Sequence, residues 1–277
     1  MSPRIKPTIV VYVIGGIVTL ITITSGILGE VLGYHDESET TREVFGNVPS
    51  AMVLLFYSIT PILVIAGTIA FAQRVRNWER GQPDRRATTR KNIGNRLADF
   101  RAGVYMQTLL RDPASGLMHS LIYFSFLILL AVTTVLEINH QVPEGAKFLH
   151  GDVYKGYVLV GDLAGVTFLL GVLWALYRRY VQRVYRIRIK SKPEHALILG
   201  TFFVLGVSGF GAEAFRIALQ DRPDFEKFAF VGYPLSGLVD GFANLEIWHR
   251  GWWIAHVLAF MAFLAILPIT MLRHIFT

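Results

Sequence analysis

The stretch PTIVVYVIGGIVTLITITSGILG, residues 7–29, contains no Asp, Glu, Lys or Arg. A helix rises by about 1.5 Å per residue, so this stretch alone is long enough to cross the roughly 30 Å hydrocarbon core of a bilayer. It is longer than the apolar region of a signal peptide, and no small-residue cleavage motif leads from it into a soluble domain. The sequence therefore predicts a membrane-spanning helix near the start of the chain.

The same test predicts three further spans, within residues 44–73, 113–136 and 251–272. Two weaker candidates complete the set: residues 156–177, which Asp162 interrupts, and residues 196–212, which are short but continue through Phe215. The composition agrees, because 53% of the 277 residues are hydrophobic and 17% are charged, whereas a soluble domain carries about 25% charged residues. Such a chain has too much apolar surface to be disordered. The predicted fold class is all-α, a polytopic membrane helix bundle. Its six transmembrane helices are expected at residues 8–29, 50–72, 117–137, 156–178, 196–217 and 251–273.

Lysine and arginine gather in the connections on one side of this predicted bundle. With both termini on that side, it holds 20 Lys and Arg against 5 Asp and Glu, and the other side holds 7 against 15. An excess of positive charge marks the cytoplasmic side of a membrane protein. We therefore expect a multi-pass protein of the cytoplasmic membrane with both termini in the cytoplasm. The formal net charge of +7 then reflects topology rather than nucleic-acid binding.

Two connections are too long to be simple turns. Residues 74–111 are basic, and an amphipathic piece near residues 97–110 is expected to lie on the membrane surface. Residues 218–249 contain two prolines and scattered aromatic residues, and are expected to form an ordered cap over the outer ends of the helices.

The chain contains no cysteine but has eight histidines. Disulfides, thiolate zinc sites, iron–sulfur clusters on this chain and covalently attached c-type haem all require cysteine, so the sequence argues against each of them. Haem b suits the histidines, because its iron accepts neutral imidazole nitrogens and its macrocycle fills apolar space between helices.

Two histidines near the carboxyl end have a spacing that suits two stacked haems. His256 and His274 are 18 residues apart. In a continuous helix this is five full turns, which places both side chains on one face about 27 Å apart. An imidazole inside a nonpolar bundle is costly unless its nitrogens are paired, so intramembrane histidines are functional candidates. For each histidine alone, a position at the lipid headgroups is the simpler alternative.

Partners for these two histidines come from the other spans. His119 is expected at the cytoplasmic level of a helix antiparallel to the last one, where it would face His274 across an inner haem. His256 would hold an outer haem, and the pattern leaves open whether His140 or His150 is the second ligand.

The closing stretch WWIAHVLAFMAFLAILPITMLRHIFT, residues 252–277, resembles the last haem-bearing helix of the nitrate reductase gamma subunit, a cytochrome b. The sequence is still more similar to the membrane region of iron–sulfur reductases related to heterodisulfide reductase, including the membrane electron-transfer-flavoprotein dehydrogenases of actinobacteria. The motifs that carry this second likeness are HSLIYFSF from His119, GDLAGV from Gly161, RRYVQR from Arg178, SGFGAEAFRIA from Ser208 and HRGWWIAH from His249.

Two features depart from these patterns. In the gamma-subunit pattern a second ligand follows the first by ten residues, and that position is Leu129 here. An outer haem therefore needs a different partner or is missing. The iron–sulfur reductases continue into cysteine-rich domains, whereas this sequence stops at Thr277. We expect the clusters either on a separate subunit or elsewhere on a longer polypeptide.

The resemblance implies an electron-transferring component of a membrane-bound, quinone-linked oxidoreductase, with one or two haems b. A cytoplasmic iron–sulfur subunit or domain would dock on the basic inner face, and electron-transfer flavoprotein is one candidate donor. The electrons would pass to menaquinone in the lipid bilayer.

Four further residues are candidates for cofactor binding. A quinone pocket needs a proton donor beside apolar walls, and Glu213 with Arg216 meets this need near the outer end of the fifth span. The plain alternative is a helix ion pair at the membrane interface. Arg178 and Arg179 would neutralise the propionates of the inner haem, or would act only as a positive-inside anchor.

We expect two units in the chain. Residues 1–112 would form two transmembrane helices with a basic cytoplasmic loop, and residues 113–277 a four-helix cytochrome b domain. Two other functions compete with this reading, a membrane transporter with a histidine proton relay and a haem-free membrane anchor for a redox complex. Transporters tend to have repeats and broken helices near the midplane, whereas here the histidines gather near the two membrane surfaces.

Overall fold

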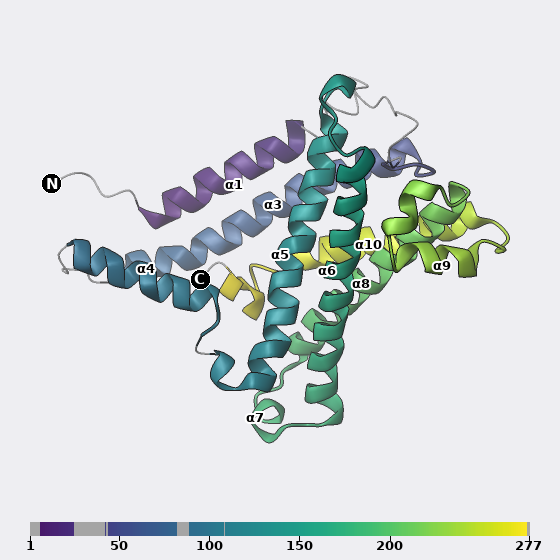
Figure 1. Cartoon of the computed structure of the whole chain (residues 1–277). Coiled ribbons are helices and arrows are strands. Elements are labelled where there is room, and N and C mark those ends of the chain that lie inside the picture. Colours follow the sequence, from purple (N-terminus) through teal and green to yellow (C-terminus); the bar gives the residue numbers. More distant parts are fainter. Residues whose placement is uncertain (1–5, 25–41, 43, 82–88, 108, 276–277) are drawn as a thin grey trace.

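A computed structural model of the chain describes residues 6–24, 42, 44–81, 89–107 and 109–275. Every regular element within these ranges is a helix, as Figure 1 shows, so the predicted all-α fold class is confirmed for them. In chain order the elements are α1 (Pro7–Ile23), α3 (Ser50–Glu79), α4 (Arg90–Val104), η2 (Leu109–Arg111), α5 (Pro113–Gln141), η3 (Glu144–Ala146), α6 (Gly151–Leu176), η4 (Tyr177–Val181), α7 (Tyr185–Arg188), α8 (Pro193–Leu219), η5 (Asp224–Phe228), α9 (Gly232–Val239), α10 (Leu245–Ile266) and η6 (Met271–Ile275).

Five of these helical segments are long and apolar enough to cross a membrane. They are α3, α5, α6 continued through η4, α8 and α10, and they correspond to five of the six predicted spans. The first predicted span is helical over the 17 residues of α1, which makes it a shorter apolar helix. Residues 25–29 of that prediction lie outside the described residues.

The bundle exposes many large apolar side chains and buries several charged groups. The side chains of Ile62 and Leu258 are 62% and 59% exposed, whereas Asp162 and Glu226 are 3% and 0% exposed. An apolar exterior around buried charged groups is stable where lipid tails replace water as the solvent. The five long helices and this surface together support a multi-pass membrane protein.

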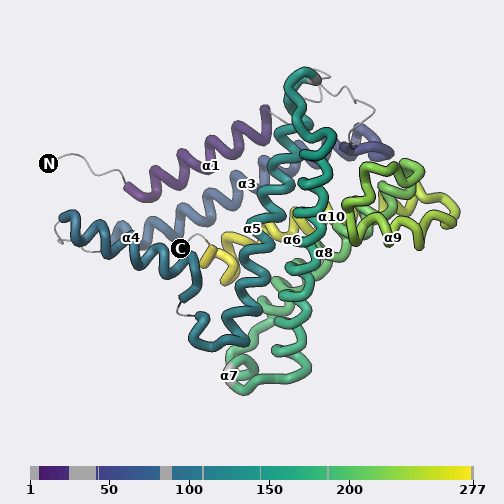
Figure 2. Tube along the Cα trace, in the orientation of Figure 1, coloured from purple at the N-terminus to yellow at the C-terminus, as the bar shows by residue number. Residues whose placement is uncertain are grey.

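The long helices pack mainly in pairs. α8 packs most extensively on α10, α5 on α6 and α1 on α3, while α3 also contacts α10. Figures 1 and 2 show α9 at one side of the molecule and α4 at the opposite side. The start of α1 meets the end of α3, where the Thr8 amide donates to Glu79 Oε1 at 2.7 Å.

Aromatic side chains and glycines hold α6, α8 and α10 together. The buried core between these helices contains Phe168, Phe202 and Phe263. At Gly206 a Cβ atom would lie only 2.6 Å from Leu169 Cδ2. Small residues allow membrane helices to approach closely and gain van der Waals contact, because lipid tails provide no hydrophobic drive for association.

The predicted continuous helix over residues 251–273 is wrong at both ends. α10 begins earlier, at Leu245, and ends at Ile266, and a turn leads into the separate 3₁₀ helix η6. The break falls at Pro268, because proline lacks the amide proton of the helical hydrogen bond and its ring clashes with the carbonyl one turn earlier. His256 and His274 therefore do not share one face of one helix.

The connections at the two ends of the bundle contain further helices. The predicted cap within residues 218–249 is ordered and contains η5 and α9. On the other side, the predicted amphipathic piece is the helix α4, which starts earlier than expected and has no buried residues. Its Leu97 and Phe100 are 63% and 71% exposed.

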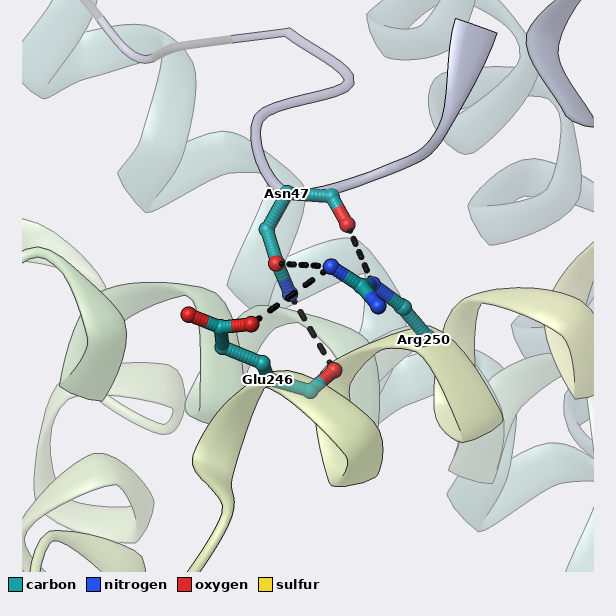
Figure 3. A network of polar contacts seen from close by, with 3 residues as sticks. All are labelled: Asn47, Glu246 and Arg250. Atoms are coloured by element: carbon teal, nitrogen blue, oxygen red, sulfur yellow. Dashed lines mark hydrogen bonds and ion pairs between the residues drawn. The ribbon is translucent and has the colours of Figure 1, made fainter. Parts of the chain in front are cut away.

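A polar network joins the segment before α3 to the start of α10 (Figure 3). Arg250 donates to the Asn47 backbone carbonyl at 2.8 Å and to Asn47 Oδ1 at 2.9 Å, and Asn47 Nδ2 donates to the Glu246 carbonyl at 3.1 Å. Asn47 has a φ of 64°, a left-handed conformation that asparagine tolerates better than most residues. These bonds fix the amino end of α3 against α10.

Candidate functional site

A cavity of about 190 Å³ lies at the α4 side of the bundle, between the start of α5, the end of α6, the start of α8 and η6. His119 and His274 line it together with Arg178, Arg179 and His195. Four of these five residues are predicted haem-site residues, and the structure brings them together. The Pro268 break contributes to this arrangement, because η6 rather than α10 carries His274 to the cavity.

The two predicted ligands of the inner haem face each other across this cavity. The ring centroids of His119 and His274 are 6.0 Å apart, with an interplanar angle of 61°. His274 Nδ1 contacts the Met271 carbonyl oxygen at 2.6 Å, and His119 Nδ1 contacts Met106 Sδ at 3.3 Å. With both Nδ1 atoms directed at protein atoms, Nε2 of each ring is the candidate ligand atom.

The separation of the two rings matches that of two imidazoles bound to one metal. Metal–imidazole bonds are about 2.0–2.1 Å long, so two rings bound on opposite sides of one metal have centres roughly 6 Å apart. Apolar side chains, among them Ile122, Phe126 and Phe202, form much of the cavity wall. Across the part of the chain that the structure describes, no group of three or more His, Asp or Glu side chains could hold a bare metal ion. Two imidazoles beside an apolar wall suit a metal that arrives in a macrocycle.

The two arginines at the cavity are held by serines. Arg178 is 7% exposed and its Nη1 donates to Ser115 Oγ at 3.0 Å, while Arg179 Nη1 donates to Ser191 Oγ at 2.8 Å. Both lie in η4, a π-helical turn, and such turns are frequent at functional sites. The arrangement places positive charge beside the histidine pair.

His195 belongs to the start of a helix. It lies in the first turn of α8, and its Nδ1 accepts the Lys192 amide at 3.0 Å. It lines the same cavity as His119 and His274.

His256 lies in α10 against α8. Its Nδ1 contacts the Leu205 carbonyl at 3.1 Å and Ser208 Oγ at 3.2 Å. Gly209 lies beside this ring, and a Cβ atom there would be 3.4 Å from His256 Cε1, an ordinary van der Waals contact. An imidazole anchored through Nδ1 to a carbonyl is suitable as a ligand through its other nitrogen.

The two alternative outer partners lie in other surroundings. His140 is buried near the end of α5, where its ring packs against Phe45 with centroids 5.3 Å apart. His150 is an exposed residue that precedes α6. Among the ring contacts of the described residues, none joins His256 to either of them. The outer haem therefore stays a prediction.

A second polar cluster lies at the α9 side of the molecule, and its centre is a buried ion pair. Arg216 Nη1 donates to Glu226 Oε1, and the Tyr154 hydroxyl donates to the same oxygen at 2.7 Å. Burial opposes the charge of Glu226, but the neighbouring guanidinium and the two hydrogen bonds lower its pKa below the ordinary value of 4.5. The ion pair of Arg216 is thus with Glu226 of the cap, not with Glu213 one turn away on α8.

Glu213 instead meets a carboxyl group of α6. Its carboxyl group lies against Gly232, where a Cβ atom would be 2.6 Å from Glu213 Oε2, and Asp162 Oδ2 accepts the amides of Val231 and Gly232 at 2.7 and 3.2 Å. The predicted quinone residue Glu213 therefore has a carboxyl partner that the sequence motif did not indicate.

Within the described residues, several buried nitrogen atoms near this cluster have no hydrogen-bond partner. They are Nε and Nη2 of Arg216 and Nδ1 of His249, on side chains that are 6% and 4% exposed. Buried polar atoms are normally hydrogen-bonded, so such atoms call for a bound water or ligand.

Sequence reasoning missed three residues of this cluster. Glu226 and Tyr154 lie at no fixed spacing from Glu213, and His249 was assigned no ligand role. The sequence contains one signal for this cluster, which is the presence of two isolated acidic residues. Asp162 lies within a predicted span and Glu226 within the predicted aromatic cap.

Taken together, the helices and buried polar sites define a membrane-embedded helical protein, and two proteins similar to this chain are named as oxidoreductases. The chain is 25% identical over 249 residues to the "EtfAB:quinone oxidoreductase" of Syntrophomonas wolfei subsp. wolfei, covering 85% of this chain and 34% of that protein. It is 26% identical over 223 residues to the "Probable iron-sulfur-binding oxidoreductase FadF" of Bacillus subtilis, covering 79% of this chain and 30% of that protein. The chain thus spans about a third of the length of these relatives. No family model matches the chain, and no solved structure matches it.

Proposed function

We propose that this chain is the membrane-embedded, haem-b-binding part of an oxidoreductase that links a cytoplasmic electron donor to menaquinone. The observation that carries the proposal is the approach of His119 and His274, with ring centroids 6.0 Å apart, in a cavity between antiparallel segments. The names of the two relatives add quinone, electron-transfer flavoprotein and iron–sulfur chemistry to this picture.

At the inner site, His119 and His274 would hold haem b through Nε2, and the haem when bound supplies one-electron transfer. The Met271 carbonyl orients the His274 ring through Nδ1. Arg178 and Arg179 supply positive charge for the two propionates. A second haem on His256, with His140 or His150 as the other ligand, is the corresponding prediction for the opposite side.

At the opposite side, Glu213 and Arg216 would bind the quinone headgroup. The unpartnered nitrogens of Arg216 support this assignment, because they offer hydrogen bonds to a carbonyl oxygen. Glu213 would exchange a proton with the bound quinone. Both groups lie near the end of α8, which is an accessible depth for a molecule dissolved in the bilayer.

We propose that the two predicted units of the chain have different roles. Residues 113–277 would form the cytochrome b domain of the nitrate reductase gamma type, and residues 1–112 would add two helices and a basic loop. We propose that the basic side faces the cytoplasm and receives the donor, an iron–sulfur subunit or domain or electron-transfer flavoprotein. Complementary charge would guide that encounter.

A visible spectrum of the detergent-purified protein tests the proposal directly. Reduced b-type haem gives sharp absorbance bands, which neither a histidine-relay transporter nor a haem-free anchor would show. We expect His119→Ala and His274→Ala each to remove the same haem. His195→Asn is the matched control, because it keeps a capping side chain at the same cavity and leaves the haem in place. A colourless parent protein, or full haem content in either alanine variant, would refute the proposal.

A further inference from the structure

The carboxyl groups of Asp162 and Glu213 meet where α6, α8 and the start of α9 converge. Asp162 is 3% exposed and accepts two backbone amides from Val231 and Gly232. Glu213 lies against the same turn, because a Cβ atom at Gly232 would be 2.6 Å from Glu213 Oε2. Because residue 232 is glycine, both carboxyl groups can approach the same turn of the backbone.

Both carboxyl groups lie against the same backbone turn, Asp162 through its bonds to the Val231 and Gly232 amides and Glu213 through its contact with Gly232. Ionised carboxylates only accept hydrogen bonds, so the two groups can bond to each other only when one of them carries a hydrogen. Two like charges at this separation in a buried site would repel strongly. The two amides that donate to Asp162 Oδ2 already supply the partners of a carboxylate, which places the shared proton on Glu213.

The Asp162–Glu213 pair lies next to the residues that are proposed to bind the quinone headgroup. The charged or titratable groups that act on Glu213, besides Asp162, are Arg216 on the same helix, Arg42 from the segment before α3, and Tyr157 of α6. The partnerless Arg216 nitrogens lie one helical turn from Glu213, and the buried Nδ1 of His249 adds a further unsatisfied atom near this arginine.

We propose that Asp162 and Glu213 share a single proton and form the proton-exchanging pair of the quinone site, with Asp162 as the positioning residue. This inference rests on the proposed function, in which Glu213 contacts the quinone. The inference adds Asp162 of α6 to a quinone site for which the sequence indicated only residues of α8.

Reduction of the quinone to the quinol consumes two electrons and two protons. The reduced flavoprotein or iron–sulfur donor supplies the electrons. For each proton, the O–H bond of Glu213 breaks and an O–H bond forms at a quinone carbonyl oxygen. Glu213 then recovers a proton from the aqueous side nearest to α9, while Asp162 keeps its two backbone amides. Two such transfers complete one quinol.

Infrared spectroscopy of the purified full chain tests the shared proton without haem or quinone turnover. A protonated carboxyl has a C=O stretch that is separate from the carboxylate bands and that shifts in D₂O. We expect this band in the parent protein, its loss in Glu213→Gln and its displacement in Asp162→Asn. The matched control is Glu137→Gln, which alters another carboxyl within a span, bonded to Tyr57 at 2.9 Å, and leaves the band unchanged. A parent protein without the band, or Glu213→Gln with the parent spectrum, would overturn the inference.

A second measurement connects the pair to quinone chemistry. Menadiol, a soluble quinol, is mixed with the protein, and haem reduction is followed by visible absorbance. We expect Glu213→Gln to slow this reaction about 100-fold, since a positioned acid or base contributes roughly 10²–10⁴ in rate. Equal rates in parent and variant overturn the assignment to the quinone site. A haem-free parent overturns the proposed function instead, and the infrared bands then still decide whether the proton is shared.

Discussion

Replacing Glu226 by glutamine should strongly destabilise the protein. The carboxyl side chain has no exposed surface, and that of Arg216 is 7% exposed. The substitution therefore leaves a buried guanidinium without its counter-charge. Removing one partner of a buried ion pair costs about 3–5 kcal/mol. At roughly 2 °C per kcal/mol for a chain of this size, the apparent Tm should fall by about 6 °C or more.

Intrinsic tryptophan fluorescence in detergent during heating is a suitable assay, because the chain has five tryptophans and no cysteine for thiol dyes. Asp224→Asn is the matched control in the same short helix η5, since its ion pair with Lys227 is exposed. Surface pairs contribute little, so this variant should unfold like the parent. The double variant Arg216→Met/Glu226→Leu should recover much of the lost stability, because two apolar residues leave no buried charge.

The destabilisation should also depend on pH. Glu226 has a lowered pKa in the folded protein. Its contribution is therefore fully present above the unfolded-state pKa and is lost as the pH falls through the lower folded-state pKa. The Tm difference between the parent and Glu226→Gln should be largest near neutral pH and should shrink below about pH 4.5, the ordinary value of this group. A Tm equal to that of the parent at pH 7, or a difference that is constant into the acid range, would refute the reasoning.

Two further predictions concern the helices themselves. Gly211→Ala should lower the Tm, because its Cβ would overlap the Trp252 indole, whereas Gly200→Ala in the same helix meets no atom within 4 Å and should gain up to about 1 kcal/mol from helix propensity; equal Tm shifts would contradict this. Pro268→Ala should let α10 continue toward His274, which raises helical content by circular dichroism and lowers haem content per polypeptide. Unchanged values of both quantities would show that the proline does not cause the break.

The membrane helices could be predicted well from the sequence because hydrocarbon imposes a local rule. Each span must satisfy its own backbone and expose few charges, so long apolar stretches with few charges are sufficient to find α3, α5, α6, α8 and α10. The break at Pro268 was also visible locally, but the regular His256–His274 spacing favoured a continuous helix. The steric effect of one proline overrides that spacing.

The candidate sites could be predicted only in part. His119, His274, Arg178 and Arg179 were all named from sequence, and the structure places them at one cavity. Their approach depends on η6, which no periodic pattern predicts. The expected pairing of Glu213 with Arg216 followed from helical spacing alone, but distant segments supply stronger partners.

Local sequence properties and tertiary contacts therefore decide different features of this protein. Hydropathy and charge are properties of short segments, and they were sufficient to predict a helical, multi-pass membrane protein. The choice of partner for each buried charge was decided only by tertiary structure, which joins Arg216 to Glu226 and brings Asp162 and Glu213 to the same backbone turn. In a low-dielectric interior a charge is stabilised by whichever opposite or protonated group lies within hydrogen-bonding distance, and that distance depends on how the helices pack.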